Sequence, residues 1–347
     1  MDQALAPAAP PGRGWPFYVK VGALSLALIV VGFVGWTGLR LWNAWRSIDR
    51  IEFALDDARI ALPPPSLAPE DPADPVWDPP DDAFTTYLLV GSDETDKKAV
   101  PSADSILLFI EPRDDRRSIL VSLPRDLLVT SPCSGEPARL AVNLAGCDGV
   151  RGPELLALAI EGYSNLEIDH FAVFQFEGFI RVVDELGGIE LCVEHDFRIV
   201  RSFGPVLRAG CQVADGESAL AWMRSRTPQE LIDGVWVAVE GGDAARLERQ
   251  QDFMLAVLAK LREFRSIDQL TDLAGDLANT FAIDEGLSLL DAVSRAWDLR
   301  SLSPSAIVRP RIRVTPGVTE SGSYAAIPVR TFAEELIAVF PPAAAYY

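Results

Sequence analysis

Positive charge is scarce in this sequence. Lys and Arg together number 31 against 50 Asp and Glu, and the formal net charge is −19 over 347 residues. Affinity for nucleic acids comes mostly from cationic side chains that neutralise phosphates, so this balance argues against general nucleic-acid binding. Any anionic ligand must therefore meet a local cluster of Arg.

Histidines and close cysteine motifs are scarce as well. The two histidines, His170 and His195, are too few and too badly placed for a zinc site, and no C-x-x-C motif occurs. The four cysteines form two closely spaced pairs, Cys133 with Cys147 and Cys192 with Cys211. Disulfides within these pairs are the shortest-loop choice among three connectivities and require an oxidising compartment. Four buried free thiols in a cytosolic enzyme are the alternative.

Internal repeats are absent from the sequence, and 49% of its residues are hydrophobic. A chain of this length and composition can bury one large core or two modest ones, which argues against a disordered or fibrous protein. We expect one principal globular domain.

One long run without charge lies near the N-terminus. Residues 21–39 are predominantly apolar and have aromatic residues on both sides, as is typical of a membrane-spanning helix. No convincing small-residue cleavage site follows, which favours a retained signal anchor. Residues 42–60 have helical periodicity and are expected to continue the span, and residues 62–82 form a linker rich in Pro and Asp. The predicted order is a short cytoplasmic tail (1–16), a transmembrane signal anchor (17–41), a juxtamembrane helix and linker (42–83) and an extracytoplasmic domain (84–347).

Strand-like and helical patterns alternate after residue 83. Strands are expected at 85–90, 105–111, 118–123, 170–175, 188–193 and 307–314. Helices are expected at 153–163, 176–186, 216–223, 243–264, 287–299 and 331–340, with Asp215 as the N-cap of the third. This alternation predicts an α/β sandwich.

Carboxylates lie at the ends of the first three expected strands. The first strand ends in Gly91 and then presents Asp93, which is where open α/β sheets place ligands, although an Asx turn gives the same pattern. Asp104 enters the second strand, and Arg125 and Asp126 follow the third. Carboxylates and an Arg at neighbouring strand ends can hold Mg²⁺ and a phosphate together. An ion pair between Arg125 and a nearby Asp is the alternative.

Four arginines lie in two short motifs further along the chain. Arg224 and Arg226 point to the same face if their segment is extended. Arg246 and Arg249 share a helix face because they are three residues apart. Guanidinium groups suit bidentate contact with phosphate, so this concentration in an acidic protein indicates an anionic ligand. A solvated helix face, in which Glu248 balances its neighbours, is the alternative.

Together these motifs resemble the LytR-CpsA-Psr family from about residue 84 to residue 264, and more loosely to the C-terminus. The matching motifs are Gly-x-Asp (91–93), Pro-Arg-Asp (124–126), Gly-Pro-Glu-Leu (152–155), Phe-Glu-Gly-Phe (176–179), Val-Asp-x-Leu-Gly-Gly-Ile (183–189), Arg-x-Arg (224–226) and Arg-x-x-Arg-Gln (246–250). The segment 102–105 stands where the family has Arg-x-Asp-Thr.

The resemblance implies both a fold and an activity. The fold would be a three-layer α-β-α sandwich with a mixed central sheet (core 84–264), in which an apolar tunnel holds a lipid tail. The activity would be a Mg²⁺-dependent phosphotransfer that moves a glycopolymer from a polyprenyl-pyrophosphate carrier onto peptidoglycan or another cell-envelope acceptor, together with hydrolysis of prenyl pyrophosphates. The protein would sit in the cell membrane by a single span, with its catalytic domain outside the cytoplasm.

The resemblance also implies roles for individual residues. Asp93 and Asp104 would bind Mg²⁺, and Asp93 and Asp126 are the candidates for taking a proton from the attacking hydroxyl. The expected catalytic residues are therefore Asp93, Arg125 and Asp126. The pyrophosphate would be held by Arg125, Arg224, Arg226, Arg246, Arg249 and Gln250.

Two departures from the family pattern stand out. Ser102 occupies the place where the family usually carries Arg, and Lys97 or Lys98 could supply the missing cation. This departure motivates the alternative function, a non-catalytic protein of the cell envelope that binds polyprenyl phosphates or regulates wall metabolism. Residues 227–242, which include Trp236, are longer than expected and indicate a substrate-shaping loop or an insertion.

Overall fold

The fold is seen in a computed structural model of the chain. It describes residues 36, 38–43, 45–62, 83–92, 103–113, 117–147, 149–199, 206–239, 242–266, 269, 273, 281–319 and 322–339. Most of the expected membrane span lies outside these ranges, and so do Asp93, Lys97, Lys98 and Ser102. Within the described ranges, none of the helices has the length and apolar character needed to span a bilayer.

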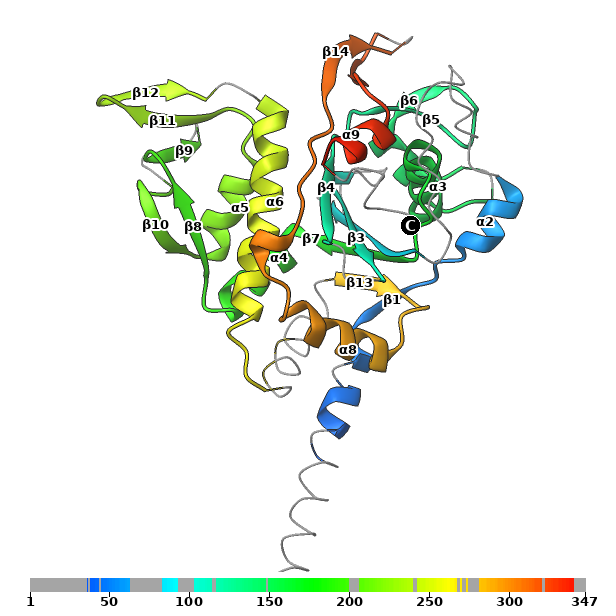
Figure 1. Ribbon diagram of the computed structural model, residues 1–347, viewed down its shortest axis with the longest axis horizontal. Helices are drawn as coiled ribbons and strands as arrows, with labels where there is room; N and C mark the ends of the chain where they lie inside the picture. Colours follow the sequence, from blue (N-terminus) through cyan, green and yellow to red (C-terminus); the bar gives the residue numbers. More distant parts are fainter. Residues whose placement is uncertain are drawn as a thin grey trace, which may run out of the picture.

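A mixed six-stranded sheet forms the centre of the molecule (Figure 1). Its strands, in spatial order, are β1 (Asp49–Ile51), β13 (Phe281–Asp284), β7 (His170–Gln175), β2 (Phe84–Ser92), β3 (Ala103–Pro112) and β4 (Ile119–Leu123). The pairs β1–β13 and β7–β2 are parallel, and the other three are antiparallel. The middle strands are nearly continuous apolar runs because both faces of the sheet are covered.

One face of the sheet packs against α3 (Gly152–Ser164), which is buried almost all round. Pro153 stands in its first turn, where a missing N–H costs nothing, and Asn165 ends it in the left-handed conformation. Around α3 lie α2 (Leu55–Ala61), the 3₁₀ helix η1 (Leu140–Ala145) and α9 (Phe332–Val339). This side holds the largest apolar core.

The other face is covered by α6 (Gly242–Leu261) and α8 (Leu289–Leu299). Beyond α6 stands a second lobe with its own core, made by α4 (Phe176–Glu185), α5 (Gly216–Arg224), the β8–β10 pair (Ile189–Val193 and Gly210–Ala214) and the β9–β11–β12 sheet (Phe197–Ile199, Pro228–Ile232 and Val235–Ala238). In Figure 1, α6 (yellow) runs between this lobe and the central sheet. Both parts of the molecule therefore share one helix.

Two hairpins complete the chain, β5–β6 (Leu128–Thr130 and Pro137–Arg139) and β14–β15 (Val314–Val318 and Tyr324–Pro328). Disulfides join Cys133 to Cys147 and Cys192 to Cys211, which confirms the shortest-loop pairing. The second disulfide connects residues that face each other across β8 and β10.

Most expected elements are confirmed within a few residues, but three segments differ. The helix expected over 42–60 is interrupted after residue 47, because residues 49–51 pair with β13 and extend the sheet, and it resumes as α2 (Leu55–Ala61). Residues 307–313 make only one isolated bridge, and the strand begins at Val314; Pro310, which lacks a ladder N–H, opposes an earlier start. The long connection 227–242 contains a hairpin that turns at Asp233 and Gly234, both with positive φ.

Candidate functional site

Two carboxylates and three arginines meet where β3 begins and β4 ends. Arg125, just after β4, places Nη1 at 2.6 Å from Oδ1 of Asp104 and Nε at 3.4 Å from Oδ2 of Asp126. Arg224, the last residue of α5, has Nη2 at 3.8 Å from the other oxygen of Asp104. Arg139 on β6 adds a contact of 3.3 Å to Oδ1 of Asp126. Both oxygens of each carboxylate thus face guanidinium groups.

A second group of charges occupies the first turns of α6. Oδ1 of Asp243 lies 3.5 Å from Nε of Arg226 and 3.1 Å from Nη2 of Arg246. Burial lowers the pKa of Arg246, and the positive charges of Arg226 and Arg125 lower it further, against the opposing effect of Asp243. The two groups of charges are therefore close enough to interact.

Arg249 lies one turn further along α6 and is 8% exposed. Its Nη2 donates a hydrogen bond to the carbonyl of Ser225, and its guanidinium carbon is 5.7 Å from the centre of the Phe197 ring. Burial lowers the pKa of Arg249 to about 10. A cation is thus held away from water, and among the described residues no carboxylate is in hydrogen-bond contact with it, which favours the entry of an anion.

The helix α5 carries Arg224 to the site. Its N-cap, Asp215, accepts a hydrogen bond from the backbone N–H of Ser218, as the sequence predicted. The condition under which Arg224 and Arg226 would share a face, an extended segment, is not met, because α5 continues through Arg224 and the backbone becomes extended only at Ser225. Arg224 and Arg226 reach the site by this change of direction and not by strand alternation.

Several buried polar atoms on β2, β3, β4 and α6, near the charged groups in sequence, have no hydrogen-bond partner within the described part of the chain. They are the hydroxyls of Ser92, Ser105 and Ser122, Oε1 of Gln250, and Nε of Arg246 and Arg249. A buried polar atom without a partner is costly, and native proteins usually satisfy such atoms with water, an ion or a ligand. Most of these atoms are donors, so a ligand with many acceptor oxygens fits them.

The charged residues offer a limited set of metal ligands. Asp104 supplies a carboxylate beside the arginines, and its expected partner Asp93 lies outside the described residues. In the part of the chain that the structure covers, the one close group of three possible ligands is Glu190, Cys192 and Cys211. Because those two sulfurs form a disulfide, that group is unsuitable for a metal.

An apolar cavity of about 190 Å³ lies between the central sheet and the helices α6 and α8. Its walls are built mainly from leucines and aromatic residues, among them Leu89, Phe109, Leu120, Leu258 and Leu299. The same helix, α6, thus carries buried charge in its first turns and apolar side chains farther along. From Arg249 to Leu258 the helical rise amounts to about 14 Å.

An open groove of about 620 Å³ lies beside Arg224 on the second lobe. Its walls combine apolar residues, such as Ile180, Ile199 and Leu220, with polar ones, such as Glu217. The open groove therefore borders Arg224, whereas the apolar cavity lies farther along α6 from the arginines.

The structure brings together the described residues that the sequence singled out. Among the residues that sequence reasoning did not assign to the site are Arg139, Asp243 and Ser122. Asp243 is three residues before Arg246 on the same helix face, which is a signal that could have found it. Ser122 is a polar residue inside an otherwise apolar buried strand, which is a weaker signal.

Comparison with known proteins gives concordant matches. The LytR_cpsA_psr family model matches residues 66–336. The probable cell wall biosynthesis protein LcpB of Corynebacterium glutamicum is 30% identical over 229 residues, which cover 59% of this chain and 49% of that protein. A polyisoprenyl-teichoic acid–peptidoglycan teichoic acid transferase, TagU of Oceanobacillus iheyensis, is 28% identical over 207 residues, covering 59% of this chain and 60% of that protein. The chain matches less than two thirds of either relative.

Among solved structures, a LytR-Csp2A-Psr enzyme from Actinomyces oris superposes with a TM-score of 0.60 at 25% identity. The match covers 86% of this chain and 96% of that one. The sequence and the mixed α/β architecture are therefore both similar to those of the matched proteins.

Proposed function

The chain belongs to the LytR_cpsA_psr family, and from this we propose that it is a phosphotransferase of the cell envelope. It moves a glycopolymer from a polyprenyl-pyrophosphate carrier onto peptidoglycan or another envelope acceptor. The name of the TagU relative describes such a transfer for teichoic acid. In this proposal residues 17–41 anchor the protein in the membrane with the domain outside the cytoplasm, where its two disulfides would be stable.

The observation that carries the proposal is the arginine cluster next to an apolar cavity. A polyprenyl-pyrophosphate has a doubly anionic head and a long hydrocarbon tail, and α6 presents the matching surfaces in the same order. Arg246 and Arg249 would hold the head, and the cavity lined by Leu258 would hold the tail. Neither a soluble phosphate nor a plain fatty acid would contact both the arginine cluster and the apolar cavity.

The pyrophosphate is proposed to lie among the guanidinium groups of Arg125, Arg224, Arg226, Arg246 and Arg249, with Gln250 beside them. A hydroxyl oxygen of the acceptor attacks the phosphorus that bears the glycopolymer. A new P–O bond forms, the bond to the bridging oxygen breaks, and polyprenyl phosphate departs with the electron pair. Fixed cations stabilise the charge that develops on the departing oxygens.

The proton of the attacking hydroxyl needs an acceptor. Both oxygens of Asp126 face arginines, Arg125 and Arg139. Because both oxygens of Asp126 are already engaged by guanidinium groups, we assign Asp126 to positioning Arg125 and Asp93 to the proton transfer.

Mg²⁺ suits the hard oxygen donors at this site, because it typically takes one or two carboxylates together with phosphate oxygens. Asp104 would hold it with Asp93. When bound, the ion would neutralise charge on the pyrophosphate oxygens. The open groove beside Arg224 leaves space for a carbohydrate acceptor.

The test is transfer by the full-length protein in nanodiscs that contain a polyprenyl-pyrophosphate-linked oligosaccharide and a soluble peptidoglycan fragment. We expect Mg²⁺-dependent product, at least about 100-fold less product for Arg224→Ala and Asp104→Asn, and wild-type levels for Arg309→Ala, whose partner Asp252 lies on the outside of α6. Activity that persists in EDTA and in both site variants would contradict the proposal.

Ser102 stands where the family usually carries Arg, and this difference favours one alternative function, a lipid-binding or regulatory protein without turnover. Tight, Arg224-dependent binding of the carrier lipid with no transfer and no hydrolysis would select that alternative. Restoring Arg by Ser102→Arg should then produce turnover, which makes the two functions separable in one series of variants.

A further inference from the structure

The apolar cavity ends in three polar residues at its far end from Asp104. Nη1 of Arg295 on α8 donates to Oε2 of Glu111 on β3 at 2.8 Å, and the hydroxyl of Tyr87 on β2 lies 3.5 Å from the same oxygen. The guanidinium carbon of Arg295 is 5.6 Å from the centre of the Tyr87 ring. All three residues line the cavity.

These residues connect both walls of the cavity. Glu111 and Tyr87 belong to the sheet and Arg295 to the covering helix, so the ion pair spans the space between them. Their charged groups keep contact with solvent, since the side chains of Glu111 and Arg295 are 26% and 38% exposed. A hydrocarbon chain that passed between them would break these contacts or desolvate the charges, which is unfavourable.

The position of the ion pair defines a length. Asp104 and Glu111 are seven residues apart on β3, which corresponds to about 23 Å at the usual rise of a strand. An extended isoprene unit contributes four main-chain carbons, or about 5 Å with ordinary carbon–carbon bonds. A tail of about four to five isoprene units would therefore be needed to reach from the pyrophosphate site to the ion pair. The cavity encloses only the last part of that path, since its lining residues on β3 are Phe109 and Glu111.

We propose that Glu111, Arg295 and Tyr87 close the far end of the prenyl site and set the length of tail that the domain encloses. The inference rests on the proposed function and deepens it, because it names residues that determine which part of the carrier is bound. Carbons beyond that length remain outside the domain and add nothing to affinity.

The test measures binding of prenyl monophosphates of increasing length, from geranyl through geranylgeranyl to longer chains. Full-length protein in one nonionic detergent would be titrated by calorimetry, with every ligand in the same micelles. The wild type is compared with the double variant Glu111→Leu, Arg295→Met, which makes the end of the cavity apolar. Asp252→Leu with Arg309→Met is the matched control, because it removes an ion pair that does not line the cavity.

We expect wild-type and control affinities to rise with tail length and to level off at about four to five units. In the double variant the rise should continue, and the longest ligands should bind about tenfold more tightly, which corresponds to roughly 50 Å² of additional buried apolar surface. Geranyl phosphate should bind all three proteins alike. Glu111→Gln, which keeps the shape of the side chain, should give an intermediate gain and guards against misfolding of the double variant.

The same levelling-off in the wild type and both cavity variants, or no levelling-off in the wild type, would overturn the inference. If no prenyl phosphate binds, or if binding is unaffected by Arg224→Ala, then the proposed function itself fails. The dependence on Arg224 therefore separates the two failures.

Discussion

Arg246 and Arg249 are 4% and 8% exposed, yet both carry positive charge in a protein whose surface could easily have solvated them. Burial lowers the pKa of each. Keeping these two cations buried therefore lowers the free energy of unfolding of the ligand-free protein. Such a cost is common where a site is built for a charged partner. The stability of this region should therefore respond to anions.

Replacing Arg249 tests this at a single residue. Arg249→Met should raise the melting temperature of the ligand-free protein, since it removes a buried charge and keeps the length of the side chain. Inorganic pyrophosphate should raise the melting temperature of the wild type and have a smaller effect on the variant. Differential scanning calorimetry measures both, and a lower melting temperature for ligand-free Arg249→Met would contradict the argument.

The lowered pKa of Arg249 also fixes the sign of a pH effect. At pH values between about 10, the lowered pKa, and the ordinary pKa of Arg, the unfolded chain binds more protons at Arg249 than the folded protein does. The contribution of Arg249 to the free energy of unfolding therefore rises with pH in that range. It is lowest at pH values below about 10. The difference in stability between Arg249→Met and the wild type should shrink as the pH rises through this window, as measured by urea titration; a constant difference would contradict the assignment.

Residue types and spacing were enough to single out arginines that the structure brings close to shared carboxylates. They were not enough to show that Asp126 faces Arg139, or that the Ser122 hydroxyl has no hydrogen-bond partner among the described residues. Those contacts depend on how β4, β6 and α6 pack, and a single sequence carries no measure of that packing.

At the scale of elements, α5 shows how a local signal supports the site. Asp215 caps the helix, and the hydrogen bond from the N–H of Ser218 lowers the pKa of its carboxyl group. Asp215→Ala should lower the free energy of unfolding by about 1 kcal/mol, whereas Asp215→Asn should cost much less, since Asn is also a good cap. Because the folded pKa is lowered, the contribution of Asp215 is complete above the ordinary pKa and is lost as the pH falls through the lowered value. Urea titration at neutral and acidic pH checks this; an equal loss for Ala and Asn at neutral pH would rule out the cap.

Elements with strong local signals were predicted well, and elements that depend on distant partners were not. The strand β7 agrees with its prediction at both ends, because its apolar run is bounded by clear breaks. The strand β1 was read as helix, since the pattern of residues 42–60 is helical and its partner β13 lies more than 200 residues away. Tertiary pairing overrode local propensity there.

At the scale of the whole molecule, the second lobe depends on a covalent link. The Cys192–Cys211 disulfide closes a loop with a sequence separation of 19, and loop-closure entropy for that length gives about 3 kcal/mol. Cys192→Ser with Cys211→Ser should lower the free energy of unfolding by about that amount and weaken carrier binding, because α5 and its Arg224 belong to this lobe. Denaturant titration and calorimetry test both effects, and unchanged stability would contradict the first.

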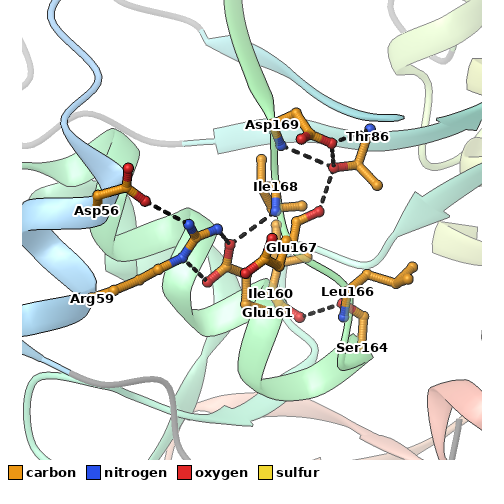
Figure 2. Close-up of polar contacts among 10 residues, drawn as sticks. All are labelled: Asp56, Arg59, Thr86, Ile160, Glu161, Ser164, Leu166, Glu167, Ile168 and Asp169. Atoms are coloured by element: carbon orange, nitrogen blue, oxygen red, sulfur yellow. Dashed lines mark hydrogen bonds and ion pairs between the residues drawn. The ribbon is translucent and has the colours of Figure 1, made fainter. Parts of the chain in front are cut away.

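The N-terminal segment is tied to the body of the protein by an ion pair between helices. Figure 2 shows Arg59 of α2 reaching Glu161 of α3, while Asp56 approaches Arg59 from the solvent side. Glu161 is 7% exposed and also accepts a hydrogen bond from the N–H of Ile168. This arrangement fixes α2, and with it the start of the domain, against the largest core.

Arg59→Ala should therefore lower the free energy of unfolding by about 2 kcal/mol, because it leaves a buried carboxylate without its cation. Asp56→Ala is the control within the same network; its carboxylate is exposed, so the expected loss is below about 0.5 kcal/mol. Urea titration compares the two, and equal losses would show that burial of Glu161 does not determine the cost.

The pairing of Asp49–Ile51 with β13 has a practical consequence for anyone who shortens this protein. Removing the residues before the linker would leave β13 as the outermost strand, with its N–H and C=O groups unpaired along one side. Strands uncovered in this way tend to pair with a second copy, so a version that starts at Phe84 should form dimers or aggregates, whereas one that retains residues 48–62 should stay dispersed in light scattering.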